Sequence, residues 1–164
     1  MQITLKGNPI NLTGEFPSVG QDAPDFSLTT SALADVSLKE YEGKKKVISI
    51  VPSLDTPVCA TSTQKFNQEV ASKADVALLV VSGDLPFAAG RFCETNSTGK
   101  VVTLSTMRNQ DFAESYGVLM ADGPLAGLTA RAVIVLGENN TILHAELVPE
   151  IAQEPDYAAA LAVL

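Results

Sequence analysis

Hydrophobic residues occur along this chain in short runs that alternate with polar, turn-forming segments. Runs dominated by Val, Ile, Leu and Ala, with little polar alternation, are typical of strands buried on both faces. Such strands are predicted over residues 47–51, 76–81 and 101–104. Alternating segments predict two hairpins, one at the N-terminus with Gly7-Asn8-Pro9 as its turn and one joining residues 133–136 to 141–148. Residues 26–28 and 36–38 are shorter strand candidates.

Helical spacing predicts a helix over residues 57–72, directly after the first buried strand, with Thr56 at its N-cap. Its apolar positions form one stripe that faces the body of the protein. The stripe consists of Cys59, Thr63, Phe66 and Val70. We therefore expect the Cys59 side chain to point inward, into a pocket rather than into bulk water.

Three further helices are predicted. Asp84 is expected to cap a second helix, which carries Cys93 and ends in the polar segment 96–99. A short helical piece is expected over residues 111–116, and an amphipathic helix over residues 155–164. Strands that alternate with helices, followed by a late hairpin, indicate an α/β fold in which helices flank a mixed, mostly parallel sheet. The length of 164 residues fits one domain spanning residues 1–164.

The net charge of −8 disfavours nucleic-acid binding, which requires basic patches. The one basic cluster, Lys44-Lys45-Lys46, is interpreted as a solvated turn. No apolar run is long enough to span a bilayer, so we expect no membrane association. The N-terminal residues lack the basic and apolar regions of a signal peptide, which favours the cytoplasm and leaves the periplasm open.

Cysteine and histidine are scarce. The two cysteines, Cys59 and Cys93, do not form a Cys-x-x-Cys pair, which disfavours a zinc site and a thioredoxin-type reductant. His144 is the only histidine and lacks the partners that a metal centre or a Cys–His hydrolase would need. We interpret it as a strand residue without a catalytic role.

Cys59 has the most informative surroundings in the sequence. It lies in the first turn of a predicted helix, where unpaired backbone N–H groups stabilise a thiolate, and a thiolate is a nucleophile. The Thr56 hydroxyl, one turn earlier, is within reach of the sulfur or of an oxygen bound beside it. Pro52 would shape the loop around the pocket. The alternative is an inert, buried cysteine that acts as a small hydrophobic side chain.

Cys93 and Arg131 are the remaining candidates. A second thiol condenses with a cysteine sulfenic acid to give a disulfide, so Cys93 becomes important if Cys59 is oxidised. The predicted helix that carries Cys93 contains Gly90 and ends in a polar loop, which would ease its unwinding. Arg131, at the start of an apolar strand, is either a surface charge or a partner that holds the Cys59 thiolate and polarises a bound oxygen.

These residues resemble a known family. Pro52, Thr56 and Cys59 match the Pro-x-x-x-Thr-x-x-Cys signature of peroxiredoxins. Three further segments, together with the Glu154-Pro155-Asp156-Tyr157 stretch, resemble the bacterial thiol peroxidases, which are atypical two-cysteine peroxiredoxins. These segments are Asp84-Leu85-Pro86-Phe87-Ala88, Arg91-Phe92-Cys93 and Ala130-Arg131-Ala132-Val133. The resemblance extends over essentially the whole chain.

The resemblance implies a thioredoxin-like fold with an added N-terminal β-hairpin, a homodimer, and reduction of alkyl hydroperoxides and hydrogen peroxide. It implies that Cys59 is the peroxidatic cysteine and Cys93 the resolving cysteine of the same subunit. Thr56 and Arg131 would activate the site, and Pro52 would shield it. Thioredoxin would be the reductant, and no metal, haem or flavin would be needed.

One segment departs from the family pattern. Relatives often have Gly-Ala-Glu-Gly after the resolving cysteine, whereas this chain has Glu94-Thr95-Asn96-Ser97. The loss of a glycine bears on how readily Cys93 moves and how a reductase docks. A non-enzymatic redox sensor, in which the Cys59–Cys93 pair switches a binding surface, is the rival interpretation.

Overall fold

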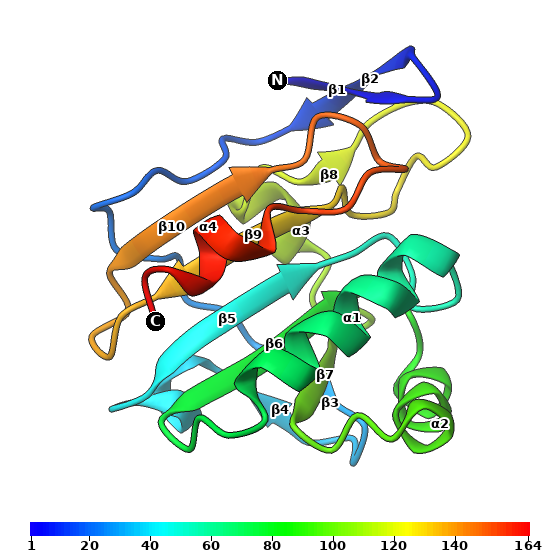
Figure 1. The fold of residues 1–164 in the computed structure, drawn as a ribbon. Coiled ribbons are helices and arrows are strands. Elements are labelled where there is room, and N and C mark those ends of the chain that lie inside the picture. Colours follow the sequence, from blue (N-terminus) through cyan, green and yellow to red (C-terminus); the bar gives the residue numbers. More distant parts are fainter.

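The computed structural model describes residues 1–164 and contains a seven-stranded mixed sheet. Its strand order is β10-β9-β5-β6-β7-β3-β4 (Figure 1). The strands are β3 (Leu28–Thr30), β4 (Asp35–Val36), β5 (Lys45–Ile50), β6 (Val76–Ser82), β7 (Val101–Ser105), β9 (Ala132–Leu136) and β10 (Ile142–Leu147). The mixed α/β architecture confirms the predicted class.

The expectation of a mostly parallel sheet is wrong. Only β5–β6 and β6–β7 pair in parallel, and the other four pairings are antiparallel. In the β9–β10 hairpin, β9 pairs with β5 and is antiparallel to it, and β3 is antiparallel to β7. Sequence patterns report that a strand is buried, but not the direction in which it pairs.

A second, three-stranded sheet has the order β1-β2-β8, formed by β1 (Gln2–Leu5), β2 (Asn8–Thr13) and β8 (Leu119–Met120). It confirms the N-terminal hairpin, with the turn shifted. Lys6 and Gly7 form the turn at positive φ, and Pro9 lies inside β2 opposite Thr4. A two-residue turn with both residues at positive φ matches the right-handed twist of the flanking strands.

The two faces of the large sheet have different coverings. In β5, Val47 faces one core cluster and Ile48 the other, as the alternation of a strand requires. The helices α1 (Pro57–Val70) and α4 (Tyr157–Leu161) lie in front of the sheet in the view of Figure 1, and α3 (Asp111–Ser115) lies behind it. α2 (Pro86–Asn96) contributes Ala89 to the cluster of α1.

The helix boundaries confirm part of the prediction. Helix α1 begins at Pro57, and all four residues of its expected stripe are buried. The closing helix is shorter than expected, because Asp156 caps it by accepting from the Ala159 N–H at 2.9 Å and it ends at Leu161. Of the 26–28 candidate only Leu28 is in a strand, and a 3-10 helix, η1 (Leu38–Tyr41), follows β4.

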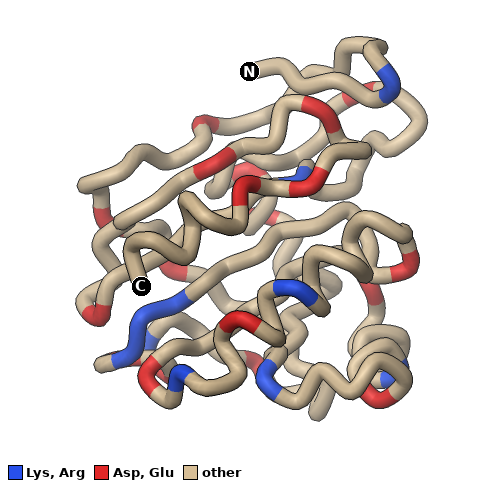
Figure 2. Tube along the Cα trace, in the orientation of Figure 1, with Lys and Arg blue, Asp and Glu red and all other residues tan.

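Of the lysine run, only Lys44 lies in a solvent-exposed turn as expected. Lys45 and Lys46 begin β5, visible as the longest basic stretch of the trace in Figure 2. Lys46 is fully buried, and its ammonium donates to the carbonyls of Gly137 and Glu138 at 3.3 and 3.0 Å. Burial lowers the pKa of Lys46. The bonded carbonyls belong to the β9–β10 turn, which is distant in sequence.

None of the helices has both the length and the hydrophobicity that crossing a membrane requires.

Candidate active site

The candidate site forms where β5 ends and the chain enters α1. Thr56 is the N-cap residue of α1 and Pro57 its first residue, which places Cys59 in the first turn. The side chain of Cys59 is fully buried, in the cluster that includes Phe66. The first N–H groups of a helix have no partner within the helix, so the start of α1 offers backbone donors near Cys59.

Arg131 meets Cys59 from a different part of the chain. It directly precedes β9, is 2% exposed, and donates from Nη2 to the Cys59 sulfur at 3.4 Å. Its Nε and Nη2 both donate to the Ile151 carbonyl, at 3.1 and 3.0 Å. The guanidinium is therefore held in one orientation, with an edge toward the sulfur.

No carboxylate neutralises this buried arginine. Arg131 takes part in none of the three ion pairs of the structure, and its Nη1 is buried without a hydrogen-bond partner. An isolated buried cation is costly unless an anion compensates it. Apart from the Ile151 carbonyl, the Cys59 sulfur is the group at hydrogen-bond distance from the guanidinium.

A small cavity of about 210 Å³ lies beside this site. Cys59 points inward, as expected, but it is buried in the core and is not part of the lining of this cavity. Arg131, Thr56 and Pro52 line it, so the structure brings these three predicted residues together. The remainder of its lining is mostly apolar and comes from the N-terminal hairpin, the start of α1 with the segment before it, and two further loops. These residues include Leu5, Val58, Leu125, Leu128 and Ile151.

Thr56 does not bond the sulfur. Its hydroxyl donates to the Ser53 carbonyl at 3.0 Å, so of the two expected partners, the sulfur or an oxygen bound beside it, the sulfur is not bonded and the oxygen stays a prediction. The bond closes the loop that precedes α1 and uses the one hydroxyl proton. The Thr56 hydroxyl oxygen can still accept a hydrogen bond through its lone pairs.

Asp84 supports the loop beside the site, whereas the sequence predicted that it caps α2. Leu85, rather than Asp84, occupies the N-cap of α2. The Asp84 carboxylate accepts from the Ser53 hydroxyl and the Leu54 N–H, both at 2.7 Å, and from the Ser82 hydroxyl at 2.8 Å. It thus ties the loop before α1 to the segment that leads into α2. The only sequence signal of this link is that Ser53 follows β5 and Asp84 follows β6, two neighbouring parallel strands.

Cys93 lies within α2, half-buried, and both cysteines are free thiols. The end of α2 is held by Ser97 in the left-handed conformation, whose N–H donates to the Cys93 carbonyl. The Asn96 side chain accepts from the Gln64 amide of α1 at 2.7 Å. Residues 94–97, which differ from the family pattern, therefore complete the last turn of α2 and anchor it to α1.

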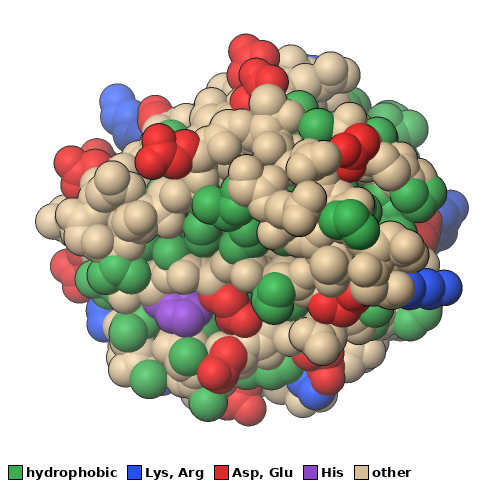
Figure 3. All heavy atoms as spheres, turned by 90° about the horizontal axis from the view of Figure 1, so that it is seen from above, with side chains coloured by type: hydrophobic (Ala, Val, Ile, Leu, Met, Phe, Trp, Pro, Cys, Tyr) green, Lys and Arg blue, Asp and Glu red, His purple; other side chains and the backbone are tan.

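His144 lies in β10, as expected, and outside the cavity lining. Its Nε2 is 3.9 Å from a carboxylate oxygen of Glu146. The ring appears at the surface beside acidic side chains in Figure 3. No group of three or more His, Cys, Asp or Glu side chains is arranged to hold a metal ion.

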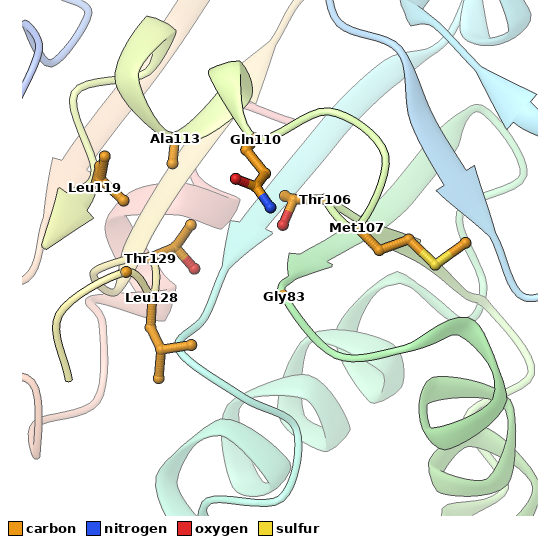
Figure 4. Close-up of a pocket in the computed structure, with 9 residues that line it drawn as sticks. Gly83, Thr106, Met107, Gln110, Ala113, Leu119, Leu128 and Thr129 are labelled. Atoms are coloured by element: carbon orange, nitrogen blue, oxygen red, sulfur yellow. The ribbon is translucent and has the colours of Figure 1, made fainter.

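A larger cavity of about 480 Å³ adjoins the first one (Figure 4). The two share Leu128 in their linings. Thr106, Gln110 and Thr129 contribute polar atoms to the larger cavity, and Met107 and Leu119 apolar ones. Thr129 also donates to the Val51 carbonyl at 2.7 Å, which links this cavity to the end of β5.

Comparisons with known proteins show the family to which the chain belongs. The Redoxin family model matches residues 18–161. A thiol peroxidase of Leptospira interrogans serogroup Icterohaemorrhagiae serovar copenhageni is 51% identical over 163 residues, covering 98% of this chain and 95% of the relative. The crystal structure of a peroxiredoxin-like protein from Aquifex aeolicus superposes with a TM-score of 0.92 at 42% identity, covering 98% and 94% of the two chains. A thiol peroxidase from Chromobacterium violaceum shares the fold, with a TM-score of 0.91 at 24% identity, covering 97% and 92%.

Fold and site together define a redoxin, a thioredoxin-like protein whose chemistry rests on cysteine thiols. Within this class the chain belongs to the thiol peroxidase family of the peroxiredoxins. It is therefore a peroxiredoxin-type oxidoreductase with thiol-dependent peroxidase activity, which places it among antioxidant enzymes.

Proposed function

We propose that this protein reduces alkyl hydroperoxides and hydrogen peroxide, with Cys59 as the peroxidatic cysteine. The observation that carries the assignment is the 3.4 Å contact between Arg131 and the Cys59 sulfur, both buried, with no ion pair between Arg131 and a carboxylate. A fixed positive charge stabilises the thiolate before reaction and the leaving oxyanion during it. Among the other lining residues, Pro52 restricts the access of water.

In the first step the Cys59 thiolate attacks the terminal oxygen of the hydroperoxide. The S–O bond forms as the O–O bond breaks, giving a sulfenic acid and an alkoxide that takes up a proton to leave as an alcohol. The unpaired Nη1 of Arg131 donates to the departing oxygen. The Thr56 oxygen accepts from the peroxide O–H, which orients the O–O bond toward the sulfur.

In the second step the Cys93 thiol condenses with the sulfenic acid of the same subunit, releasing water and forming the Cys59–Cys93 disulfide. Cys93 is on a separate helix, so the end of α2 must unwind, which breaks the Gln64–Asn96 bond. A thioredoxin dithiol then supplies two electrons and two protons, which return both cysteines to thiols.

The apolar lining of the cavity supports an organic hydroperoxide as substrate. The adjoining 480 Å³ cavity offers further space for a substituent beyond Leu128. We also propose a homodimer. Leu85 and Phe87, at the start of α2, are 55% and 68% exposed, and a second copy would cover them. Light scattering of the wild type and of Phe87→Glu tests the dimer, which the substitution should weaken.

The central experiment treats the reduced protein with one equivalent of cumene hydroperoxide and records its intact mass and thiol content. We expect loss of both thiols and of two hydrogen atoms, with the bridge mapped to Cys59 and Cys93 of one chain. Cys93→Ser is the matched control, and it should stop at a Cys59 sulfenic acid. Persistence of both thiols would contradict the peroxidase assignment, and an oxidised Cys59 with an untouched Cys93 would remove Cys93 from the cycle.

A further inference from the structure

The orientation of Arg131 depends on one backbone carbonyl. The Ile151 carbonyl accepts from both Nε and Nη2, and no other protein oxygen binds the guanidinium. Ile151 lies in the loop that follows β10, outside regular secondary structure. A carbonyl in a loop holds a side chain firmly only if the loop itself is held. The anchor of this loop therefore controls where Arg131 points.

Glu150 provides that anchor. One carboxylate oxygen accepts from the N–H groups of Lys6 and Ala152, at 3.0 and 3.2 Å. The other accepts from the Thr4 hydroxyl at 2.8 Å and the Gly7 N–H at 3.1 Å. A single side chain thus binds the turn of the N-terminal hairpin and the loop that contains Ile151.

The backbone reinforces the same junction. The Thr4 N–H donates to the Pro149 carbonyl at 2.8 Å, and the Ile151 N–H donates to the Thr4 carbonyl at 2.9 Å. Strand β1 therefore pairs with residues 149–151 through backbone hydrogen bonds at Thr4. These donors, foremost the Lys6 N–H and the Thr4 hydroxyl, lower the pKa of Glu150 to about 2, so the carboxylate is ionised at physiological pH.

We propose that Glu150 is a positioning residue for the peroxidase reaction: it clamps the N-terminal hairpin onto residues 149–152, so that the Ile151 carbonyl aims Arg131 at the Cys59 sulfur. The proposal rests on the proposed function of Cys59 and Arg131. In this proposal the N-terminal hairpin helps to position Arg131, because it supplies three of the four donors to the carboxylate. Glu150 itself lies outside the lining of the cavity and does not touch the substrate.

The first test measures the rate constant for oxidation of reduced Cys59 by cumene hydroperoxide. Glu150→Ala removes all four acceptor bonds, and misplacement of a positioning group by about 1 Å costs about 100-fold, so we expect a loss of roughly 10- to 100-fold. Glu150→Gln retains one acceptor oxygen and should lie between Glu150→Ala and the wild type.

Asp122→Asn is the matched control. Asp122 holds the same hairpin through Asn11, accepting from its N–H at 2.9 Å and its side-chain amide at 2.6 Å, and does not touch residues 149–152. This variant should react within about twofold of the wild type, because Arg131 stays in place. An equal loss in Asp122→Asn and Glu150→Ala would show that loosening of the hairpin, rather than aiming of Arg131, causes the effect.

A double-mutant cycle tests the route of the effect. If Glu150 acts through Arg131, Glu150→Ala should have little further effect on the rate in an Arg131→Met background. Full additivity of the two losses would refute the proposal. A merely structural role would lower stability without producing this coupling.

A measurement without peroxide separates the proposal from the proposed function. Arg131 is the only buried one of the three arginines, so its Nε–H is expected to exchange slowly with solvent in the wild type. Nitrogen-15 NMR should show faster exchange of this proton in Glu150→Ala and unchanged exchange in Asp122→Asn. Unchanged exchange in Glu150→Ala would refute the proposal. A wild type that does not react with peroxide but shows this pattern would refute the peroxidase assignment alone.

Discussion

Replacement of Arg131 by methionine is the sharpest test of the site. Methionine has a similar length, lacks charge and cannot donate to the Cys59 sulfur. Two unit charges 3.4 Å apart interact by about 5 kcal/mol at an effective dielectric constant of about 20. Because the guanidinium spreads its charge over three nitrogens, its attraction to the sulfur is weaker than this estimate for two point charges. At about 1.4 kcal/mol per factor of ten, we expect Cys59 oxidation to slow by about 100- to 1000-fold.

Stability should respond differently from rate. Arg131→Met removes a buried charge without a carboxylate partner, which is favourable, and leaves the Ile151 carbonyl without its donors, which costs about 1–3 kcal/mol. The two effects oppose each other, so we expect the melting temperature to change by no more than about 4 °C. A large loss of rate in a normally folded variant would separate catalysis from folding.

The assay is a quenched-flow experiment with cumene hydroperoxide under single-turnover conditions, read by intact mass. The chain has no tryptophan, so its fluorescence offers no strong signal. Arg131→Lys is the control that keeps the charge but loses the planar fork that binds the Ile151 carbonyl, and its rate should be intermediate. A folded Arg131→Met protein that reacts within threefold of the wild-type rate would refute the electrostatic reasoning.

Three further outcomes are expected. Cys93→Ser should consume one equivalent of hydroperoxide at the wild-type rate and then fail to turn over with thioredoxin, as a coupled NADPH assay would show; continued turnover would exclude Cys93 as the resolving residue. Asp84→Asn should lower stability by about 1–3 kcal/mol in urea unfolding, because it weakens the bonds to Leu54 and its neighbours; an unchanged midpoint would contradict this. The pKa of Glu150 is lowered from 4.5 to about 2 on folding, so its contribution is present above pH 4.5 and lost as the pH falls toward 2. Acid unfolding of Glu150→Gln should lack that part of the pH dependence, and identical acid profiles would contradict the assigned shift.

Much of the fold was predictable because local patterns report local burial. The first buried strand is followed by a helix that begins at Pro57, and the stripe from Cys59 to Val70 is buried as its spacing indicates. The cysteine-bearing first turn, and the family it points to, could therefore be inferred without coordinates. The prediction that Lys46 is exposed was wrong. A lysine is expected at the surface unless the carbonyls that bind its ammonium are known, and these come from a distant turn.

The sequence by itself determined most of the elements, the position of Cys59 in a helix first turn and the candidate roles of five residues. Only the tertiary structure decided which distant groups meet there: Arg131 contacts a sulfur 72 positions earlier, and Glu150 binds Thr4 across 146 positions. It also decided the antiparallel pairing of most of the sheet. The physical reason is that periodicity records which face of an element is buried, whereas contacts between elements depend on how the whole chain packs.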